Sequence, residues 1–450
     1  MEGEESAAAA RDPSGPLGAL LLRRGEGREV LAGAAAAGLV LLAYGLLKPA
    51  RDAIFAAEGT GRELLWTGTF AGAVLLQPLW SALADRLTAR ALLTWALRGA
   101  ALGALLGGAL LGLGEEPGAG AQVTELPGSW WEGRWSRTTG GWSLSAGPRV
   151  WAERLFYVGL SIGNLLLVSV IWAALARRFE RLQARRLFGL VAAGASVGSL
   201  LGSSVVALGG GAQPSWALAL LGAVCLEGAL RALRRIGAEG APPRSGALRG
   251  LGLLVAVPRM RALALYVLLF TLGSTWLYFL TGRLVETQLP EGPERVAFFA
   301  RMQAWTSAAT LAAQLLLSGR AMRSLGLGPT LAILPLLSMA GLAAVATAPG
   351  LTTLLWVNVV MGAARYAFAR PGREALLAGA PRAQLFQAKA ALDTAVYRGG
   401  DLASAWLFAA VAGVASGGPL ALAALPALAV GAGLGLYLGR PDADVADSSA

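Results

Sequence analysis

Apolar runs of about 20 residues recur along the chain, and they constrain its fold more than any other feature. A run of this length, coiled as an α-helix, can cross a hydrocarbon layer about 30 Å thick. Of the 450 residues, 55% are hydrophobic and only 14% are charged, so little sequence remains for a soluble domain between the runs. Helices also satisfy their own backbone hydrogen bonds inside a bilayer. The sequence therefore predicts an all-α, multi-pass membrane protein.

The apolar runs predict twelve transmembrane helices, joined by mostly short connectors. They cover residues 30–50, 64–83, 91–113, 151–175, 188–208, 214–233, 260–282, 297–317, 327–347, 352–370, 386–413 and 418–438. Arginine is concentrated in alternate connectors: Arg86 and Arg90 follow the second span, whereas the connectors 209–213 and 348–351 contain none. Connectors rich in arginine face the cytoplasm by the positive-inside rule. We therefore expect both termini in the cytoplasm.

The longest central connector, 234–258, contains Pro242 and Pro243 and separates six predicted spans from six others. Two six-helix halves are typical of the major facilitator architecture. The expected organisation is a cytoplasmic tail (1–28), an N-terminal half (29–233) with an extracytoplasmic loop (114–150), a cytoplasmic linker (234–258), a C-terminal half (259–439) and a second cytoplasmic tail (440–450).

The turn after the second predicted span has a charge pattern that fits this architecture. Asp85, Arg86 and Arg90 resemble the facilitator gating motif, in which an acid-base pair is followed by a further base. Many cytoplasmic turns contain similar charges, so the position between the second and third spans is what favours a gating role. The matching connector of the second half contains Arg320 and Arg323 and lacks the acid.

Missing residue types argue against several classes of function. The chain has no histidine, which removes the usual general base and the commonest metal ligand. Cys225 is the only cysteine, so an intrachain disulfide is impossible. The net charge of +11 comes mainly from connectors, where membrane orientation accounts for it. We therefore expect no enzyme activity, no cofactor, no metal site and no nucleic-acid partner.

Charged residues within the spans mark the candidate site, because a charge at bilayer depth costs about 2.5–3.5 kcal/mol on insertion scales. The chain has two lysines, Lys48 and Lys389, and each lies at the edge of an apolar segment or inside one. Four positions of the eleventh span are spaced four residues apart and would share one helix face: Lys389, Asp393, Tyr397 and Asp401.

The end of the first predicted span contains a second polar cluster. Tyr44, Lys48 and either Arg51 or Asp52 would share a helix face. Pro49 would bend the helix where these charges gather. An alternative interpretation is a cap at the outer surface, with side chains that extend into water.

The tenth predicted span repeats this pattern. Residues 370–374 have the order base, proline, small residue, arginine and acid, which is also the order of residues 48–52. Inverted three-helix repeats would place two such segments in spans that run in opposite directions. The same span contributes Asn358, Arg365 and Arg373 to the candidate site.

The charged residues near the ends of the first and tenth spans and within the eleventh leave a positive surplus. These segments contain seven bases and four acids, so three positive charges are left over. The bases are Lys48, Arg51, Arg365, Arg370, Arg373, Lys389 and Arg398, and the acids are Asp52, Glu374, Asp393 and Asp401. Such a surplus suits a multivalent anion, and phosphate matches both the arginine fork and the lysine ammonium. The alternative is a charge ladder, Lys389 with Asp393 and Arg398 with Asp401, that only joins helices.

Four segments resemble the non-mitochondrial ATP/ADP antiporters, the nucleotide translocases of plastids and intracellular bacteria. They are KPARD at 48–52, RLFGLVAAGASVG at 186–198, PGREAL at 371–376 and KAALDTAVYRGGD at 389–401, and weak similarity covers most of the chain. The resemblance implies a major-facilitator-like exchanger of nucleotides. It also implies that Lys48 and Lys389 bind the nucleotide phosphates.

We therefore expect a secondary transporter in a bacterial inner membrane, which moves nucleotides or a similar phosphorylated anion by alternating access, with ATP/ADP-type exchange. The expected partners are this substrate and the lipid bilayer, and we expect a monomer. The expected substrate-binding residues are Lys48, Arg51, Asp52, Asn358, Arg365, Arg373, Lys389, Asp393, Tyr397, Arg398 and Asp401. One alternative is a proton-coupled symporter of an unrelated solute, with Asp393 or Asp401 as the protonation site. Another is a membrane scaffold of the same fold that transports nothing.

Overall fold

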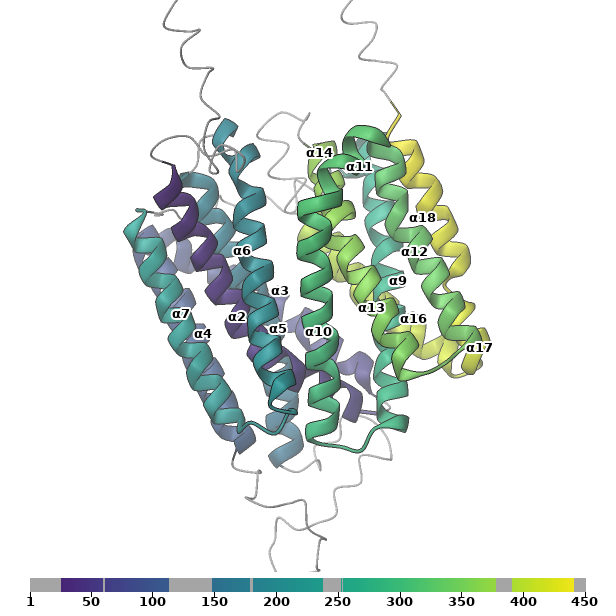
Figure 1. Cartoon of the computed structure of the whole chain (residues 1–450), viewed down its shortest axis with the longest axis horizontal. Helices are drawn as coiled ribbons and strands as arrows, with labels where there is room; N and C mark the ends of the chain where they lie inside the picture. The colour runs from purple at the N-terminus through teal and green to yellow at the C-terminus, as the bar shows by residue number, and fades with distance from the viewer. Residues whose placement is uncertain are drawn as a thin grey trace, which may run out of the picture.

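The computed structural model describes residues 26–59, 61–112, 148–178, 181–237, 252, 254–377 and 391–440. These residues form helices and no strand, which confirms the all-α prediction. Figure 1 shows two groups of helices side by side, with α2 to α7 in one group and α9 to α18 in the other. We call the first group the N-terminal bundle and the second group the C-terminal bundle.

The N-terminal bundle contains six long helices. They are α2 (Gly27–Ala57), α3 (Arg62–Arg86), α4 (Ala89–Gly112), α5 (Pro148–Arg178), α6 (Arg181–Leu208) and α7 (Ser215–Arg235).

The C-terminal bundle is less regular, because π-helical segments interrupt three of its helical runs. Its α-helices are α9 (Pro258–Gln288), α10 (Pro293–Ala313), α11 (Gly319–Ser324), α12 (Leu327–Thr347), α13 (Leu351–Ala364), α14 (Arg370–Leu377), α16 (Tyr397–Ala412), α17 (Gly417–Leu422) and α18 (Leu425–Leu438). The π-helical segments are η2 (Gln314–Ser318), η3 (Arg365–Ala369) and η4 (Leu392–Val396). Such segments are rare and often lie at functional sites.

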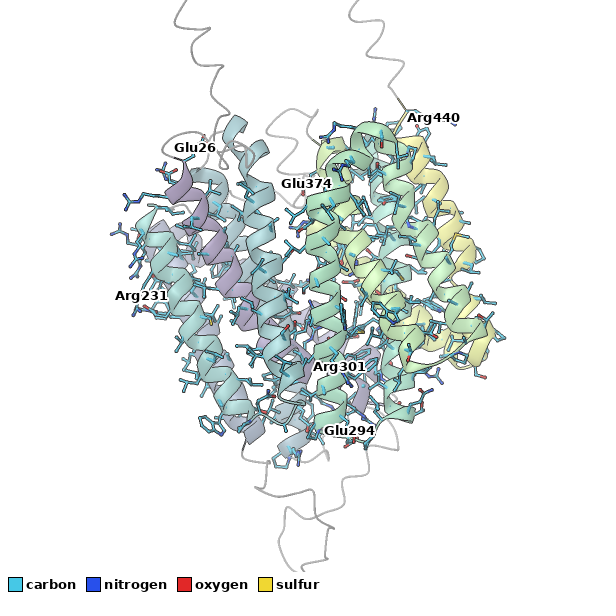
Figure 2. The ribbon with its side chains drawn as sticks, in the orientation of Figure 1. Glu26, Arg231, Glu294, Arg301, Glu374 and Arg440 are labelled. Atoms are coloured by element: carbon cyan, nitrogen blue, oxygen red, sulfur yellow. The ribbon has the colours of Figure 1, made fainter. Side chains whose placement is uncertain are left out.

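Helix is present at each of the predicted span positions. Among the described residues, nine helical stretches are long and apolar enough to cross a membrane. The predicted spans at α3, α10 and α16 are not among these nine stretches, so their membrane crossing stays a prediction. Figure 2 shows Glu26 and Arg440 at the same end of the molecule, as an even number of crossings requires.

Two helices differ from the prediction near the candidate site. The first predicted span ended at residue 50, whereas α2 continues through Pro49 to Ala57. Packing on neighbouring helices maintains α2 there although proline removes one backbone donor. In the eleventh span, η4 replaces the regular α-helical turn, so a spacing of four residues no longer defines one continuous face.

Several predicted features lie outside the described residues. These are the tails at 1–25 and 441–450, most of the loop at 114–150, most of the linker at 234–258, and Lys389. The backbone of Asp85 and Asp393 is described, but their side chains are not.

Glycines allow α2 and α6 to pack closely. A Cβ atom on Gly198 of α6 would lie 1.8 Å from the carbonyl oxygen of Gly38 on α2, and one on Gly202 would lie 2.3 Å from the carbonyl oxygen of Leu42. Only a residue without a side chain permits this approach. The glycines of the fifth span that are spaced four residues apart therefore form a helix-packing surface.

Polar side chains join the two bundles where α6 and α10 lie side by side (Figure 1). The hydroxyl groups of Ser199 and Ser307 are 2.9 Å apart, and Gln303 donates to Ser199 at 3.0 Å. Next to them, Ser196 donates to the side chain of Gln314 at 3.1 Å. These contacts are short hydrogen bonds between uncharged groups, so they hold the bundles together without a fixed ion pair.

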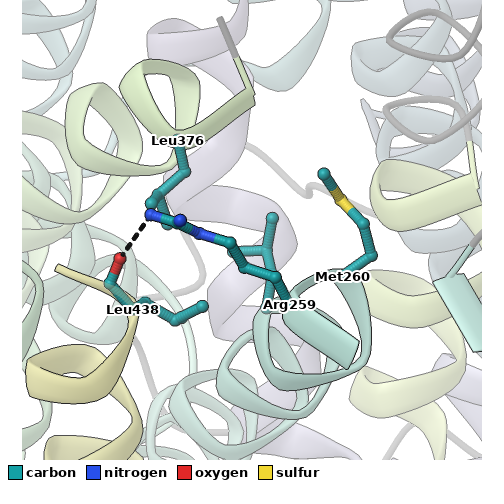
Figure 3. A pocket seen from close by; sticks show the side chains of 5 residues that line it. Arg259, Met260, Leu376 and Leu438 are labelled. Atoms are coloured by element: carbon teal, nitrogen blue, oxygen red, sulfur yellow. Dashed lines mark hydrogen bonds between the residues drawn. The ribbon is translucent and has the colours of Figure 1, made fainter. Parts of the chain in front are cut away.

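A small pocket near the end of α18 has a structural role. Figure 3 shows Arg259 of α9 in this pocket, with its guanidinium directed at the last turn of α18. Arg259 Nη2 donates to the carbonyl oxygen of Leu438 at 3.1 Å. Since the last carbonyl groups of a helix lack partners within the helix, this arginine caps α18.

Candidate functional site

The predicted cluster on α2 forms an ion network around Asp52. Asp52 is 0% exposed. Its Oδ2 atom lies 2.7 Å from Lys48 Nζ, one helical turn earlier. Its Oδ1 atom accepts from Arg51 Nη2 at 2.6 Å and from Arg51 Nε at 3.0 Å. One buried carboxylate therefore balances two cations, which leaves one positive charge on α2.

The C-terminal bundle also contributes to this network. The hydroxyl of Tyr278 on α9 donates to Asp52 Oδ1 at 2.9 Å, so Asp52 joins the two bundles. The guanidinium of Arg51 donates to the hydroxyl of Tyr44 at 2.8 Å and lies 5.4 Å from the ring centre of Tyr157. Aromatic faces attract cations, so these rings stabilise the guanidinium in its buried position. The alternative of an exposed outer cap is wrong, because α2 extends past these residues and other helices cover them.

A second cluster lies in the C-terminal bundle. Asp401 of α16 is 8% exposed. Its Oδ2 atom is 3.6 Å from Arg398 Nη1, and its Oδ1 atom accepts from Thr275 at 3.3 Å. Within the described part of the chain, the Nε atoms of Arg365 and Arg398 are buried without a hydrogen-bond partner. Arg365 is the first residue of η3, so the π-helical segment places it.

The two clusters are close enough to interact. Tyr44 of α2 has electrostatic interactions with Arg51 of its own helix and with Arg398 of α16. Asp401 interacts with both Arg398 and Arg365. The described side chains of the two clusters thus contain four bases, Lys48, Arg51, Arg365 and Arg398, and two acids, Asp52 and Asp401, which leaves two positive charges.

Other predicted site residues have separate contacts. Asn358 donates to Thr281 at 2.9 Å and to the carbonyl oxygen of Leu354 at 2.8 Å, both within the C-terminal bundle. The Tyr397 ring packs on Phe270 at 6.0 Å between centres. Arg373 is buried on α14. The pair of Arg398 and Asp401 from the proposed charge ladder is present at 3.6 Å.

The predicted gating residues are only partly described. Arg86 ends α3 and is exposed. Arg90 lies in the first turn of α4 and is also exposed. They lie on either side of the short turn between the second and third predicted spans, as expected, and their gating role stays a prediction.

The sequence analysis missed the residues that connect the bundles. Tyr278 of α9 contacts Asp52 across the bundle interface. Thr275, also on α9, contacts Asp401 within the C-terminal bundle. Phe55 of α2 is fully buried, with its ring centre 4.3 Å from that of Tyr278. A hydroxyl inside an apolar span needs a partner, so Tyr278 could have been noticed, but the sequence could not say which partner it has.

An ion pair joins the bundles near the ends of α2 and α9. Arg62 Nη2 of α3 lies 2.5 Å from Glu286 Oε2 of α9. Arg62 also donates to the carbonyl oxygens of Phe55 at 3.0 Å and Ala56 at 2.8 Å. This end of the molecule is opposite to the one where Glu26 and Arg440 lie (Figure 2). The bundles are therefore in direct contact at the far end.

Two helical bundles that lie side by side are typical of a fold of the major facilitator type, and comparisons with solved structures show this fold. The nucleoside transporter NupG aligns over 92% of this chain and 100% of its own, with 14% identity and a TM-score of 0.56. The human organic anion transporter MFSD10 (TETRAN) aligns over 92% of this chain and 100% of its own, with 15% identity and a TM-score of 0.59. No family model matches the sequence, and no curated protein matches it by sequence.

Proposed function

We propose that the protein is a secondary transporter that moves a nucleotide or a similar phosphorylated anion by alternating access, through exchange. The observation that carries this proposal is the surplus of two positive charges among the described side chains of the two clusters. A cation buried in a membrane protein requires a partner, and an anionic substrate would supply it. The Nε atoms of Arg365 and Arg398 are suitable donors because they are buried and have no hydrogen-bond partner among the described residues.

The network around Asp52 suggests how binding would be coupled to movement. Asp52 acts as an internal counter-ion for Lys48 and Arg51 while no substrate is bound. A phosphate group would compete with Asp52 for these cations, and arginine binds it through two parallel hydrogen bonds. Since Tyr278 attaches Asp52 to the other bundle, a rearrangement around Asp52 would loosen a contact between the bundles. The carboxylate of Asp52 would then take part both in substrate binding and in the movement of one bundle relative to the other.

The remaining predicted residues belong to the same proposal. Lys389, by its resemblance to the translocase lysine, would bind phosphate, and Asp393 would exchange ion pairs with it. Tyr397 would contact the base or sugar. Asn358 and Arg373 would support the site from the C-terminal bundle. Asp85, Arg86 and Arg90 would form the gating turn at the cytoplasmic end, with both termini on that side of a bacterial inner membrane.

The names of the structural neighbours agree with this class of substrate. One is called a nucleoside transporter and the other an organic anion transporter. A nucleotide combines a nucleoside with an anionic group. These names support the proposed class of substrate, and the charged side chains of the two clusters support the binding of a phosphate group.

Ligand-dependent thermal unfolding tests the proposal. The purified full-length protein is heated with ATP, ADP, other nucleotides, inorganic phosphate or unrelated anions. A ligand at a hundredfold excess over its dissociation constant stabilises the folded state by about 2.7 kcal/mol. We expect stabilisation by a nucleotide in the parent and its loss in Lys48→Ala, Lys389→Ala and Arg398→Gln. Arg440→Gln is a matched control, because Arg440 is an exposed arginine far from the site.

Counterflow in vesicles is the second step. Vesicles loaded with unlabelled nucleotide should accumulate labelled nucleotide, and the Lys48→Ala form should not. If no phosphorylated compound stabilises the parent or drives counterflow, the nucleotide proposal is wrong.

The loose contacts of Asp401 favour a second candidate, a proton-coupled symporter. A carboxylate with contacts at 3.6 and 3.3 Å could take up a proton more easily than Asp52. Uptake driven by an imposed proton gradient, and abolished in Asp401→Asn, would support this candidate. Exchange that is independent of that gradient would exclude it.

A further inference from the structure

A separate group of arginines lies on the outer surface of α4 and α7, away from the candidate site. We call Arg98, Arg231 and Arg234, together with Glu227, the α4–α7 arginine cluster. Arg98 Nε of α4 lies 3.0 Å from Glu227 Oε2 of α7, and Arg98 Nη2 lies 3.1 Å from Glu227 Oε1. Arg231 Nε is 3.6 Å from the same Oε1 atom. Glu227 is therefore shared by two arginines.

The cluster has more positive than negative charge. Arg234 donates from Nη2 to the hydroxyl of Thr94 at 2.8 Å, which is an uncharged partner. Three arginines and one glutamate leave two positive charges. The side chain of Arg231 is 70% exposed and that of Arg98 is 56% exposed. Figure 2 shows Arg231 on the outer edge of the N-terminal bundle, directed away from the other bundle.

Exposed apolar side chains border this cluster. Trp95, Leu102 and Leu106 are exposed on α4 at helical spacings from Arg98, and Leu220 and Val224 are exposed on α7 at helical spacings from Glu227. In a membrane protein, such rows face the lipid tails. The two rows belong to one surface because α4 and α7 pack closely, with a Cβ on Gly108 placed 2.9 Å from the carbonyl oxygen of Ser215.

The cluster lies toward the start of α4 and the end of α7, which are at the same end of the molecule. Arg231 is four residues before the end of α7, about 6 Å along the helix axis. Arg98 is nine residues after the start of α4, about 13 Å along its axis. Arginine side chains bury their apolar stems and extend their charged ends toward the membrane surface. The guanidinium groups can thus meet phosphate groups of the adjacent leaflet.

We infer that the α4–α7 arginine cluster binds the phosphate headgroup of an anionic phospholipid. Arg98, Arg231 and Arg234 hold the phosphate oxygens, and the apolar rows contact the acyl chains. Basic groups between transmembrane helices recognise such headgroups. The lipid is favoured over free phosphate because the charged and apolar surfaces are continuous. Glu227 orients Arg98 and competes with the lipid for the same donors.

Lipid binding to the full-length protein tests this inference. The protein is purified in a neutral detergent and titrated with diphosphatidylglycerol, phosphatidylglycerol or phosphatidylcholine, with bound lipid counted by native mass spectrometry. We expect the anionic lipids to bind preferentially. Arg231→Gln and Arg234→Gln should each weaken their binding about fivefold, the factor that corresponds to about 1 kcal/mol per basic residue at an anionic surface. Arg440→Gln, a control on another exposed arginine, should have no effect.

A variant that is expected to strengthen lipid binding separates loss of the binding site from simple misfolding. Glu227→Gln removes the internal competitor, so it should strengthen binding of anionic lipid, whereas a purely structural ion network would show no gain. Several outcomes would overturn the inference. They are equal binding of phosphatidylcholine, anionic lipid binding that is unchanged in the Arg231→Gln, Arg234→Gln double variant, displacement of the lipid by inorganic phosphate alone, or self-association of the chain through this surface.

Discussion

Asp52 and Asp401 are both buried acids beside an arginine, one in each bundle, but their surroundings differ. Asp52 has three partners, Lys48, Arg51 and Tyr278, with contacts between 2.6 and 3.0 Å. Asp401 has contacts at 3.6 and 3.3 Å, and the buried Nε atoms of Arg365 and Arg398 near it have no hydrogen-bond partner among the described residues. The first cluster is a closed ion network, whereas the second contains donors that this part of the chain leaves unsatisfied.

Under the proposed function, this difference predicts a separate task for each bundle. Charge-assisted hydrogen bonds of normal length are strong, and a network of them is rigid. The N-terminal bundle therefore contains a network that must be rearranged before its cations can bind a ligand. The C-terminal bundle offers unsatisfied donors at once, placed by a π-helical segment. We expect an anion to contact the C-terminal cluster first and the Asp52 network second.

The largest expected effect is that of Asp52→Asn. Removal of one partner from a buried ion network costs about 3–5 kcal/mol, because the cations left behind stay buried without compensation. Thermal and denaturant unfolding of the purified protein would measure the loss. A phosphorylated ligand should recover part of it, since an added anion replaces the missing charge. If Asp52→Asn lowers the free energy of unfolding by no more than Asp401→Asn does, the two clusters do not differ in the way described above.

Tyr278→Phe should have the next largest effect. The variant removes one hydroxyl that donates to a carboxylate across the bundle interface, and such bonds contribute about 1.5–3 kcal/mol. Tyr266→Phe is a matched control on the same helix, because its hydroxyl donates at 2.8 Å to an uncharged carbonyl oxygen, that of Leu331. A smaller loss, about 1 kcal/mol, is expected there. Unfolding by denaturant, compared between the two variants, decides whether the interface contact is the stronger one.

Asp401→Asn should lower the free energy of unfolding by about 1 kcal/mol, which is less than either change on the Asp52 network. The contacts of Asp401 are long, and the asparagine amide oxygen can still accept from Thr275. Its effect on ligand binding should be larger than its effect on stability. Loss of a negative charge beside Arg398 and Arg365 should tighten binding of a phosphorylated anion, as measured by the ligand-dependent shift in unfolding temperature. Weaker binding would contradict an anion site at this cluster.

The smallest expected effect is that of Thr275→Val. This variant removes a hydroxyl with a long contact of 3.3 Å to Asp401 and keeps the side-chain shape. A change of about 0.5 kcal/mol in the free energy of unfolding is expected, the lower limit for a hydrogen bond. Differential scanning fluorimetry would detect it. A loss comparable with that of Tyr278→Phe would show that Asp401 is held as firmly as Asp52.

Much of the fold followed from the sequence. Apolar runs of helical length predicted the approximate positions of the long helices. These features could be predicted because hydrophobicity and helical geometry act locally along the chain. The π-helical segments could not, since they depend on packing between helices rather than on residue type.

The candidate site was predictable in part. Lys48, Arg51 and Asp52 were found because charge within an apolar segment is rare, and the spacing of four residues predicted the contact between Lys48 and Asp52. The contact between the adjacent Arg51 and Asp52 was not predicted. The contact with Tyr278 lies 226 positions away in the sequence and was missed. The sequence also placed the end of α2 too early and therefore left open an exposed cap, which the buried position of Asp52 excludes.

The sequence by itself determined that this protein is a multi-pass helical protein with a surplus of cations inside its spans. Composition and periodicity fix these properties without any long-range contact. Only the tertiary structure decided that Asp52 is fully enclosed and attached to the second bundle, and that Asp401 is loosely held. It also decided that Arg98, Arg231 and Arg234 gather on one outer surface of α4 and α7. Burial and pairing depend on which helices meet, and that choice results from packing over the whole chain.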